Sequence, residues 1–225
     1  MSNEARQLVL NFKHEPRFGE EDFLVSFSNE TAWNMIHSWE NWNNPVLILT
    51  GPEGSGKSHL AAIWAHKTKA QFLDAKALTE QTLHRFLEYP ALVIEDLDRN
   101  LHDEAVFFHF LNRIYEHNIY LLITAQTPPS LWSVKTHDLL SRFRLAPTVD
   151  LAMPDDQLLR AVLVKLFYDR QLIVDKGVVD YLILRVERSL AKMQEVVYLL
   201  DQEALRRGRR LTRAMASEFF KDREE

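Results

Sequence analysis

The sequence contains no cysteine and no long hydrophobic run. Without cysteine there is no disulfide framework, no thiolate zinc site and no thiol nucleophile. No apolar stretch approaches the roughly 18 residues that a membrane span requires, and the first residues lack the basic-then-apolar pattern of a secretion signal. The net charge of −5 gives no general electrostatic footprint for nucleic acid. We therefore expect a cytoplasmic protein with no membrane partner.

Glycine is also scarce. Only six glycines occur in 225 residues, and three of them lie between Gly51 and Gly56. The composition is otherwise that of a globular protein, with 46% hydrophobic and 26% charged residues. A chain with little flexible backbone has placed half of its glycine in one short turn. That turn is the first place to look for a function.

Buried strands are indicated by three continuous apolar runs, 46–50, 91–94 and 119–124. Two shorter runs, 71–73 and 148–151, are candidates for further strands. Helical spacings fill the gaps, and the spacing of three leucines predicts one such helix between the second and third of these five segments; they are Leu78, Leu83 and Leu87. Alternating strands and helices predict a parallel sheet, and hence an α/β core.

After residue 151 the strand signals stop and helical patterns follow. Pro154, Asp155 and Asp156 suit the start of a helix, because carboxylates favour its positive end. Gly208 suits the end of a later helix. The expected organisation is a leader, a nucleotide-binding domain and a helical domain, at residues 1–17, 18–151 and 152–225.

The glycine turn matches the phosphate-binding pattern G-x-x-x-x-G-K-[ST] in full. It lies between an expected strand and an expected helix, where glycines let backbone N–H groups turn toward phosphate oxygens. Lys57 can reach the β- and γ-phosphates, and the Ser58 hydroxyl can bind Mg²⁺. The sequence therefore predicts a nucleotide site formed by Gly51, Pro52, Gly54, Ser55, Gly56, Lys57 and Ser58.

A second pair of residues would complete a magnesium–nucleotide site, because such a site usually needs a carboxylate at the end of a neighbouring strand. Glu95 and Asp96 follow the expected strand 91–94. In the usual order an aspartate holds the magnesium shell and the next acid polarises water. Here Glu95 is one methylene longer and Asp96 one shorter, and a register shifted by one leaves Leu97 in the place of the base. Both registers predict slow or conditional hydrolysis.

With these motifs in place, residues 18–220 resemble the AAA+ ATPases of the DnaA group, and within it the DnaA-related proteins that regulate the replication initiator. The resemblance implies an AAA+ fold, a five-stranded parallel sheet sandwiched by helices and followed by a small all-α lid. It also implies ADP or ATP with Mg²⁺ as the ligand. The phosphate loop is common to many families, so the resemblance depends on the order of the motifs and on the features below.

Further parts of the nucleotide site follow from the resemblance. Gln126 would be the sensor-1 residue, with Thr124 as second choice, although a plain strand-to-loop turn also explains this segment. Lys192 would hold the sensor-2 position, where the group carries arginine; lysine keeps the charge but cannot fork onto two oxygens. Phe23 and Val25 lie where the adenine pocket begins, or else they pack against a core helix.

The segment 138–143 resembles the arginine-finger box of the group. By this resemblance Arg142 would act on ATP held by a neighbouring subunit and neutralise charge that develops during phosphoryl transfer. The alternative is a surface ion pair with Asp138, four residues earlier on a helix.

Residues 7–12 are similar to the short motif with which bacterial proteins bind the sliding clamp, the β subunit of DNA polymerase. In an extended peptide Leu8, Leu10 and Phe12 face the same way. Leu10 and Phe12 would enter an apolar pocket, and Gln7 would form a hydrogen bond at its rim. A strand packed on its own domain explains the segment equally well.

The resemblance implies a regulatory protein that holds adenine nucleotide, binds the clamp and completes the hydrolysis site of the initiator DnaA. We expect no sequence-specific DNA binding, because the chain ends at Glu225 without a helix-turn-helix domain and the arginines of segment 206–213 have no aromatic residues between them. Self-association through the Arg142 face is left open. The alternatives are a stand-alone AAA+ ATPase or helicase loader, and a small-molecule kinase, for which no acceptor site is found.

Overall fold

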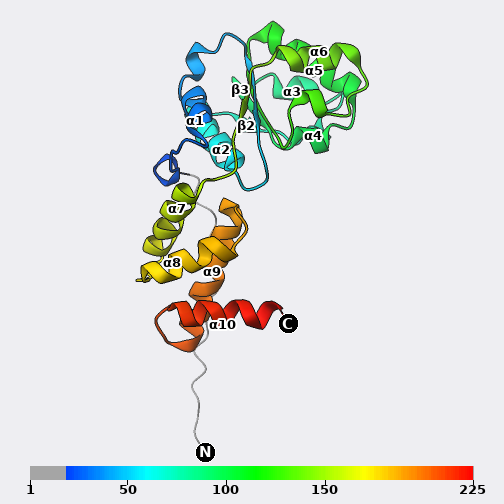
Figure 1. The fold of residues 1–225 in the computed structure, drawn as a ribbon. Coiled ribbons are helices and arrows are strands. Elements are labelled where there is room, and N and C mark those ends of the chain that lie inside the picture. The colour runs from blue at the N-terminus through cyan, green and yellow to red at the C-terminus, as the bar shows by residue number, and fades with distance from the viewer. Residues whose placement is uncertain (1–18, 225) are drawn as a thin grey trace, which may run out of the picture.

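The computed structural model describes residues 19–224. Gln7, Leu8, Leu10 and Phe12 of the expected clamp motif lie outside these residues. An α/β body is followed by a helical lid at one end, as Figure 1 shows. Among the described residues, no helix is both long and apolar enough to cross a membrane.

The body is built on a five-stranded parallel sheet in the order β2-β3-β4-β1-β5. All five expected strands are present, and the expected α/β architecture with a five-stranded parallel sheet is confirmed. Because every strand runs in the same direction, the turns that follow β1, β3 and β4 meet at one edge of the sheet. The strands are β1 (Val46–Thr50), β2 (Gln71–Phe72), β3 (Ala91–Ile94), β4 (Tyr120–Ala125) and β5 (Thr148–Asp150).

Helices cover both faces of the sheet (Figure 1). Successive residues of a strand point to opposite faces, so Ile48 packs under α5 and α6 whereas Leu47 and Leu49 pack under α1 and α2. The fully buried Trp64 lies in the core on the second face. The helices of the body are α1 (Glu30–His37), α2 (Lys57–Thr68), α3 (Leu83–Phe86), α4 (Leu97–Asn100), α5 (Glu104–His117) and α6 (His137–Leu145).

The helix predicted from the leucine spacing is much shorter than expected, since α3 covers only four residues. Thr79 and Thr82 explain the difference. Each threonine hydroxyl accepts a hydrogen bond from the backbone N–H of the other residue, at 3.2 and 2.9 Å. These side-chain bonds offer the backbone an alternative to helical pairing, so the segment before Leu83 forms a turn.

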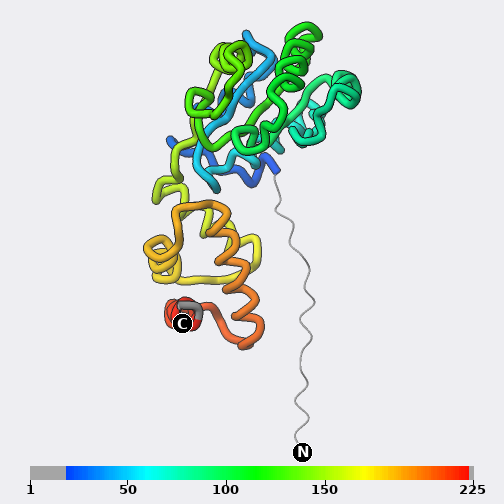
Figure 2. The backbone as a smooth tube through the Cα atoms, turned by 90° about the vertical axis from the view of Figure 1, so that its right-hand side faces the viewer, coloured from blue at the N-terminus to red at the C-terminus, as the bar shows by residue number. Residues whose placement is uncertain are grey.

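The lid consists of α7 (Asp156–Asp169), α8 (Lys176–Arg185), α9 (Leu190–Arg207) and α10 (Arg213–Glu224), with a hydrophobic core of its own. Asp155 caps α7 by accepting a hydrogen bond from the N–H of Leu158 at 2.7 Å. Gly208 ends α9 in the left-handed conformation, φ +59°. In Figures 1 and 2, which differ by a quarter turn, the lid lies at the end of the molecule opposite α6.

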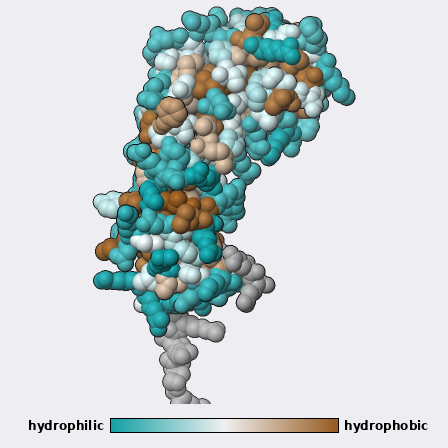
Figure 3. All heavy atoms as spheres, viewed as in Figure 1, coloured by the Kyte–Doolittle hydropathy of each residue, from teal (hydrophilic) through white to brown (hydrophobic). Residues whose placement is uncertain are grey.

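The outer surface is mostly polar, and Figure 3 shows only scattered hydrophobic groups on the face it displays. Phe27 is the most exposed of the large apolar residues that the structure describes, with 95% of its surface exposed. Single apolar residues are common on the surface of folded proteins, so isolated groups of this kind require no special explanation.

The lid docks on the body through the glycine turn. The N–H of Leu190, the first residue of α9, donates a hydrogen bond to the carbonyl oxygen of Gly54 at 3.0 Å. Gly54 has φ +73°, and a Cβ atom there would lie 1.9 Å from Oγ of Ser189. Lys165 of α7 adds an ion pair with Asp22, 2.7 Å long. The turn is therefore covered by the start of α9.

We expect Gly54→Ala to lower the free energy of unfolding by more than Gly208→Ala does. Both glycines have positive φ, and an alanine there costs about 1–2 kcal/mol of backbone strain. Gly208 has open space around it, whereas Gly54 contacts Ser189, so only the first substitution also displaces the lid. Urea unfolding followed by circular dichroism measures both values. Equal losses for the two variants would show that the lid contact contributes nothing.

Candidate nucleotide-binding site

The glycine turn joins β1 to α2 at the carboxyl edge of the sheet. Gly51, Gly54 and Gly56 all have positive φ, at +148°, +73° and +104°. L-residues rarely adopt such backbone conformations. A Cβ atom on Gly51 would also lie 2.4 Å from the carbonyl oxygen of Leu151. The three glycines are therefore required by the conformation of the loop itself.

Lys57 is the buried cation of this loop, with 6% of its surface exposed. Its Nζ donates hydrogen bonds to the carbonyl oxygens of Gly51 and Pro52, at 2.7 and 2.8 Å. Burial lowers the pKa of the Lys57 ammonium, and the negative charges of Asp96 and Asp98 oppose that shift. The positive charge thus stands inside the loop, where a phosphate group would be held.

The two serines of the loop differ in their surroundings. Ser58 lies exposed in the first turn of α2. Ser55 is buried, and its hydroxyl has no hydrogen-bond partner among the residues that the structure describes. The Ser58 hydroxyl is thus at the surface of the loop, and the Ser55 hydroxyl is enclosed by it.

Glu95 and Asp96 follow β3 beside the end of β4. The Asp96 N–H donates to Oγ1 of Thr124 at 3.0 Å, and Asp96 itself is exposed with φ +50°. Oε1 of Glu95 is buried and, within residues 19–224, has no hydrogen-bond partner. A buried carboxylate oxygen without a partner is costly unless a ligand satisfies it, and carboxylate oxygens are preferred ligands of Mg²⁺. Glu95 and Ser58 thus carry oxygen atoms of the kind that Mg²⁺ prefers as ligands.

Gln126 follows β4 and is held by Asp98 and Arg99 of α4. Its Oε1 accepts a hydrogen bond from Nη2 of Arg99 at 2.6 Å. Its backbone N–H donates to Oδ2 of Asp98 at 2.9 Å, and Asp98 also accepts from the N–H of Thr127 at 3.2 Å. Of the two sensor-1 candidates, Gln126 is engaged by Arg99, and Thr124 is buried against Asp96.

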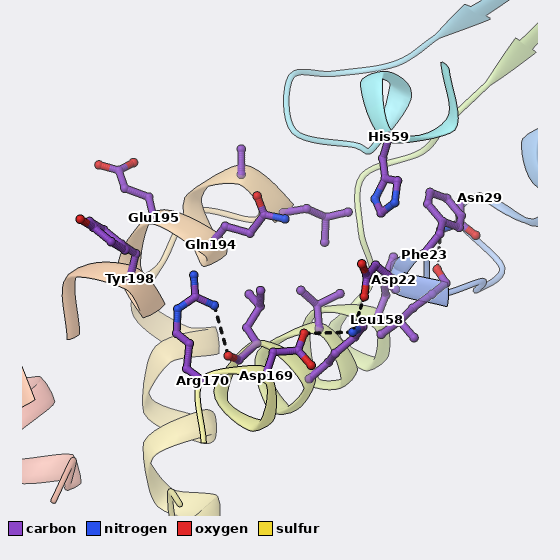
Figure 4. Close-up of a pocket in the computed structure, with 16 residues that line it drawn as sticks. Asp22, Phe23, Asn29, His59, Leu158, Asp169, Arg170, Gln194, Glu195 and Tyr198 are labelled. Carbon is purple, nitrogen blue, oxygen red and sulfur yellow. Dashed lines mark hydrogen bonds and ion pairs between the residues drawn. The ribbon is translucent and has the colours of Figure 1, made fainter. Parts of the chain in front are cut away.

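A cavity of about 450 Å³ lies next to the phosphate loop, between the body and the lid (Figure 4). Phe23, His59 and Leu158 are among the residues that line it. Phe23 stacks on Trp33, with ring centroids 5.2 Å apart. Val25 is 46% exposed and does not line the cavity. Of the two residues expected at the adenine pocket, the structure thus places Phe23 in a cavity wall and Val25 on the surface.

Lys192, the expected sensor-2 residue, lies on the exposed side of α9. Its Nζ forms an ion pair with Glu195 at 2.7 Å, and this partner raises the pKa of the lysine. Lys192 does not line the cavity, whereas Ala191 and Gln194 do. The first turn of α9 thus turns an alanine, and not the lysine, toward the cavity.

Arg142 is half-buried on α6, and its guanidinium lies over the ring of Tyr115, 5.4 Å from the centroid. Asp138 lies 3.8 Å from the ring nitrogen Nδ1 of its neighbour His137. The alternative ion pair between Asp138 and Arg142 is not formed, because Arg142 contacts the ring of Tyr115 instead. Glu104 fixes the start of α6 by accepting from the backbone N–H of Thr136 at 2.7 Å. A hydrogen bond from the side chain of Thr136, together with the backbone N–H groups of Lys135 and Thr136, lowers the pKa of Glu104.

Sequence reasoning missed several residues that hold these groups in place. Asp98 and Arg99 orient the loop that carries Gln126, and Ser189 contacts the phosphate loop. Ser189 was detectable as the cap of a helix, since its hydroxyl accepts from the N–H of Lys192. Its contact with Gly54 depends on how the lid packs on the body, and this cannot be predicted from the residues next to Ser189 in the sequence.

Comparisons with known proteins agree with this geometry. No family model matches the chain. The chain is 27% identical over 216 residues to the chromosomal replication initiator protein DnaA of Borreliella afzelii, a match that covers 83% of this chain and 44% of that protein. The chain thus spans less than half the length of that relative.

Solved structures share the fold. Domain III of the Thermotoga maritima replication initiation protein DnaA matches with a TM-score of 0.76 at 18% identity, covering 92% of this chain and 97% of that one. AMPPCP-bound DnaA from Aquifex aeolicus matches with a TM-score of 0.70 at 20% identity, covering 83% of this chain and 65% of that one. The chain therefore has an AAA+ fold, and its sequence is distantly similar to that of the replication initiator DnaA.

Proposed function

We propose that this protein is a regulator of replication initiation of the Hda type. It binds adenine nucleotide with Mg²⁺, is tethered to the sliding clamp, and stimulates ATP hydrolysis by the initiator DnaA. The reaction takes place on the ATP of the partner, which is left in its ADP form. Replication initiation is thereby lowered.

Adenine nucleotide binding is supported by the phosphate loop and the adjoining cavity. Phosphate oxygens would be held by the loop N–H groups and Lys57. Ser58 and Glu95 would hold Mg²⁺, which neutralises charge on the phosphates when bound. A distant relative, DnaA from Aquifex aeolicus, binds AMPPCP, an ATP analogue.

The position of Arg142 is the observation that carries the proposal. It lies on α6, at the opposite end of the molecule from the lid (Figures 1 and 2). The cavity beside the phosphate loop is formed where the lid meets the body. Arg142 is therefore better placed to reach a nucleotide on another subunit than the one on its own chain. Contact with Tyr115 keeps the guanidinium oriented at the surface.

A stand-alone ATPase or helicase loader is the competing function. It requires rapid hydrolysis by the chain alone, with a well-placed base beside the γ-phosphate. Asp96 is exposed, short and in a left-handed conformation, and Gln126 is bound to Arg99. These features favour slow intrinsic turnover.

Clamp binding is supported by the sequence of residues 7–12 alone.

We expect Arg142→Ala to reduce the stimulation of ATP hydrolysis by DnaA on the order of 10³-fold, because an arginine finger contributes about 10³–10⁵ to the rate. Binding of ADP by the variant itself should be unchanged. Phosphate release from a mixture of DnaA, ATP, DNA-loaded clamp and this protein measures the effect.

Arg144→Ala is the matched control, since Arg144 is an exposed arginine on the same helix. It should retain full stimulation. Full stimulation by Arg142→Ala would contradict the proposed role of Arg142. Rapid phosphate release by the wild-type protein without DnaA would favour the stand-alone ATPase instead.

For the clamp, we expect the double substitution Leu10→Ala/Phe12→Ala to weaken binding by at least roughly 10-fold, because large apolar anchors dominate such interfaces. Val9→Ala is the control, since Val9 faces the opposite way in an extended peptide. Surface plasmon resonance on immobilised clamp measures both affinities. If the wild type does not bind the clamp, the tethering part of the proposal is wrong.

A further inference from the structure

Gln194 extends from α9 into the cavity beside the phosphate loop (Figure 4). It is half-buried, one helical turn after Leu190, whose N–H bonds to Gly54. Within residues 19–224, its side-chain amide has no hydrogen-bond partner in the protein. A primary amide carries two donors and one acceptor oxygen, so this group is available to a ligand.

The cavity has apolar side chains in its wall beside the phosphate loop. Apolar side chains of Phe23, Leu158 and Leu190 line it. It also adjoins the phosphate loop directly, since a Cβ atom on Gly56 would lie 3.5 Å from Cε2 of Phe23 and 3.7 Å from Cδ1 of Leu190. Binding pockets of this kind use apolar walls for affinity and a few polar groups for orientation.

The other polar side chains of the cavity are already engaged by the protein. The Asn29 amide donates to the carbonyl oxygen of Leu24 at 3.0 Å and accepts from the N–H of Ser26 at 2.8 Å. Lys165 pairs with Asp22 and with Asp169, at 2.7 and 2.9 Å.

The remaining polar groups have partners as well. Nε2 of His59 is bonded to the carbonyl oxygen of Gly19 at 2.9 Å. Arg170 donates to the carbonyl oxygen of Leu166 at 3.3 Å, Glu195 pairs with Lys192, and Tyr198 also has a partner. Among the described residues, this leaves Gln194 as the polar side chain of the cavity with its full hydrogen-bonding capacity.

The chemistry of a glutamine amide matches one purine better than the other. Adenine presents a 6-amino donor beside the N7 acceptor, so an amide can accept from one and donate to the other. Guanine and hypoxanthine present two acceptors, O6 and N7, along the same edge. The amide oxygen would then face O6 without a proton between them.

We propose that Gln194 determines base specificity, with Oε1 accepting from the 6-amino group of adenine and Nε2 donating to N7. This inference rests on the proposed nucleotide site and adds to it the residue that selects adenine. The phosphate loop itself would not distinguish one nucleoside diphosphate from another, because its N–H groups and Lys57 would hold the phosphates and not the base.

The test compares wild type with Gln194→Met, which preserves the length of the side chain and removes both hydrogen-bonding atoms. The probes are ADP, IDP, which replaces the 6-amino group by oxygen, and 7-deaza-ADP, which lacks the N7 acceptor. Isothermal titration calorimetry with Mg²⁺ gives the affinities. Wild type should bind ADP about 10- to 100-fold more tightly than IDP, and 7-deaza-ADP more weakly than ADP.

In Gln194→Met the three affinities should fall within about threefold of one another, with an unchanged melting temperature without nucleotide. If the variant keeps the wild-type preference for ADP over IDP, or the wild-type penalty for 7-deaza-ADP, the assignment of Gln194 is overturned.

Lys57→Ala separates this outcome from failure of the nucleotide site. It should weaken ADP and IDP by the same factor, because Lys57 contacts phosphate and not base. If wild type binds none of the three probes, the proposed nucleotide site and the role of Gln194 fall together.

Discussion

The docking of α9 on the glycine turn is the constraint on which the rest of the site depends. The turn needs glycine at Gly54 because of its positive φ, and the lid uses the absence of a side chain there to bring Ser189 into contact. The bond from Leu190 to Gly54 then fixes the first turn of α9 over the loop. The cavity is a consequence of this contact, since its walls come from both the body and the lid.

Local sequence patterns predicted the parts of the fold whose cause is local. The five apolar runs became the five strands. The three long runs form β1, β3 and β4, whose residues are almost all buried, and such strands show as continuous apolar runs. The leucine spacing before β3 predicted too long a helix, because the hydrogen bonds to the hydroxyls of Thr79 and Thr82 outweigh a weak helical pattern. The phosphate loop could be recognised because its three glycines, its lysine and the start of its helix all lie within eight residues.

The parts that sequence did not predict depend on register and docking. A shift of one residue along a helix turns a side chain by about 100°, and Ala191 lines the cavity whereas Lys192 pairs with Glu195 on the exposed side of α9. Thr124 meets Asp96 because β3 and β4 pair in one particular register, Ile94 beside Ile123. Arg142 lies over Tyr115 because α5 and α6 pack side by side, which their separate sequences do not reveal.

The connection between body and lid has a consequence for exchange of the bound molecule. The segment after β5 is tied to the body, with Leu151 bonded to Thr50 and Ala152 bonded to Ser28, and α7 begins only at Asp156. Any movement of the lid relative to the body would have to bend this short connection, and it would change the width of the cavity between Phe23 and α9. The rate at which a molecule could enter or leave the cavity would then depend on these few connecting residues, which do not line the cavity themselves.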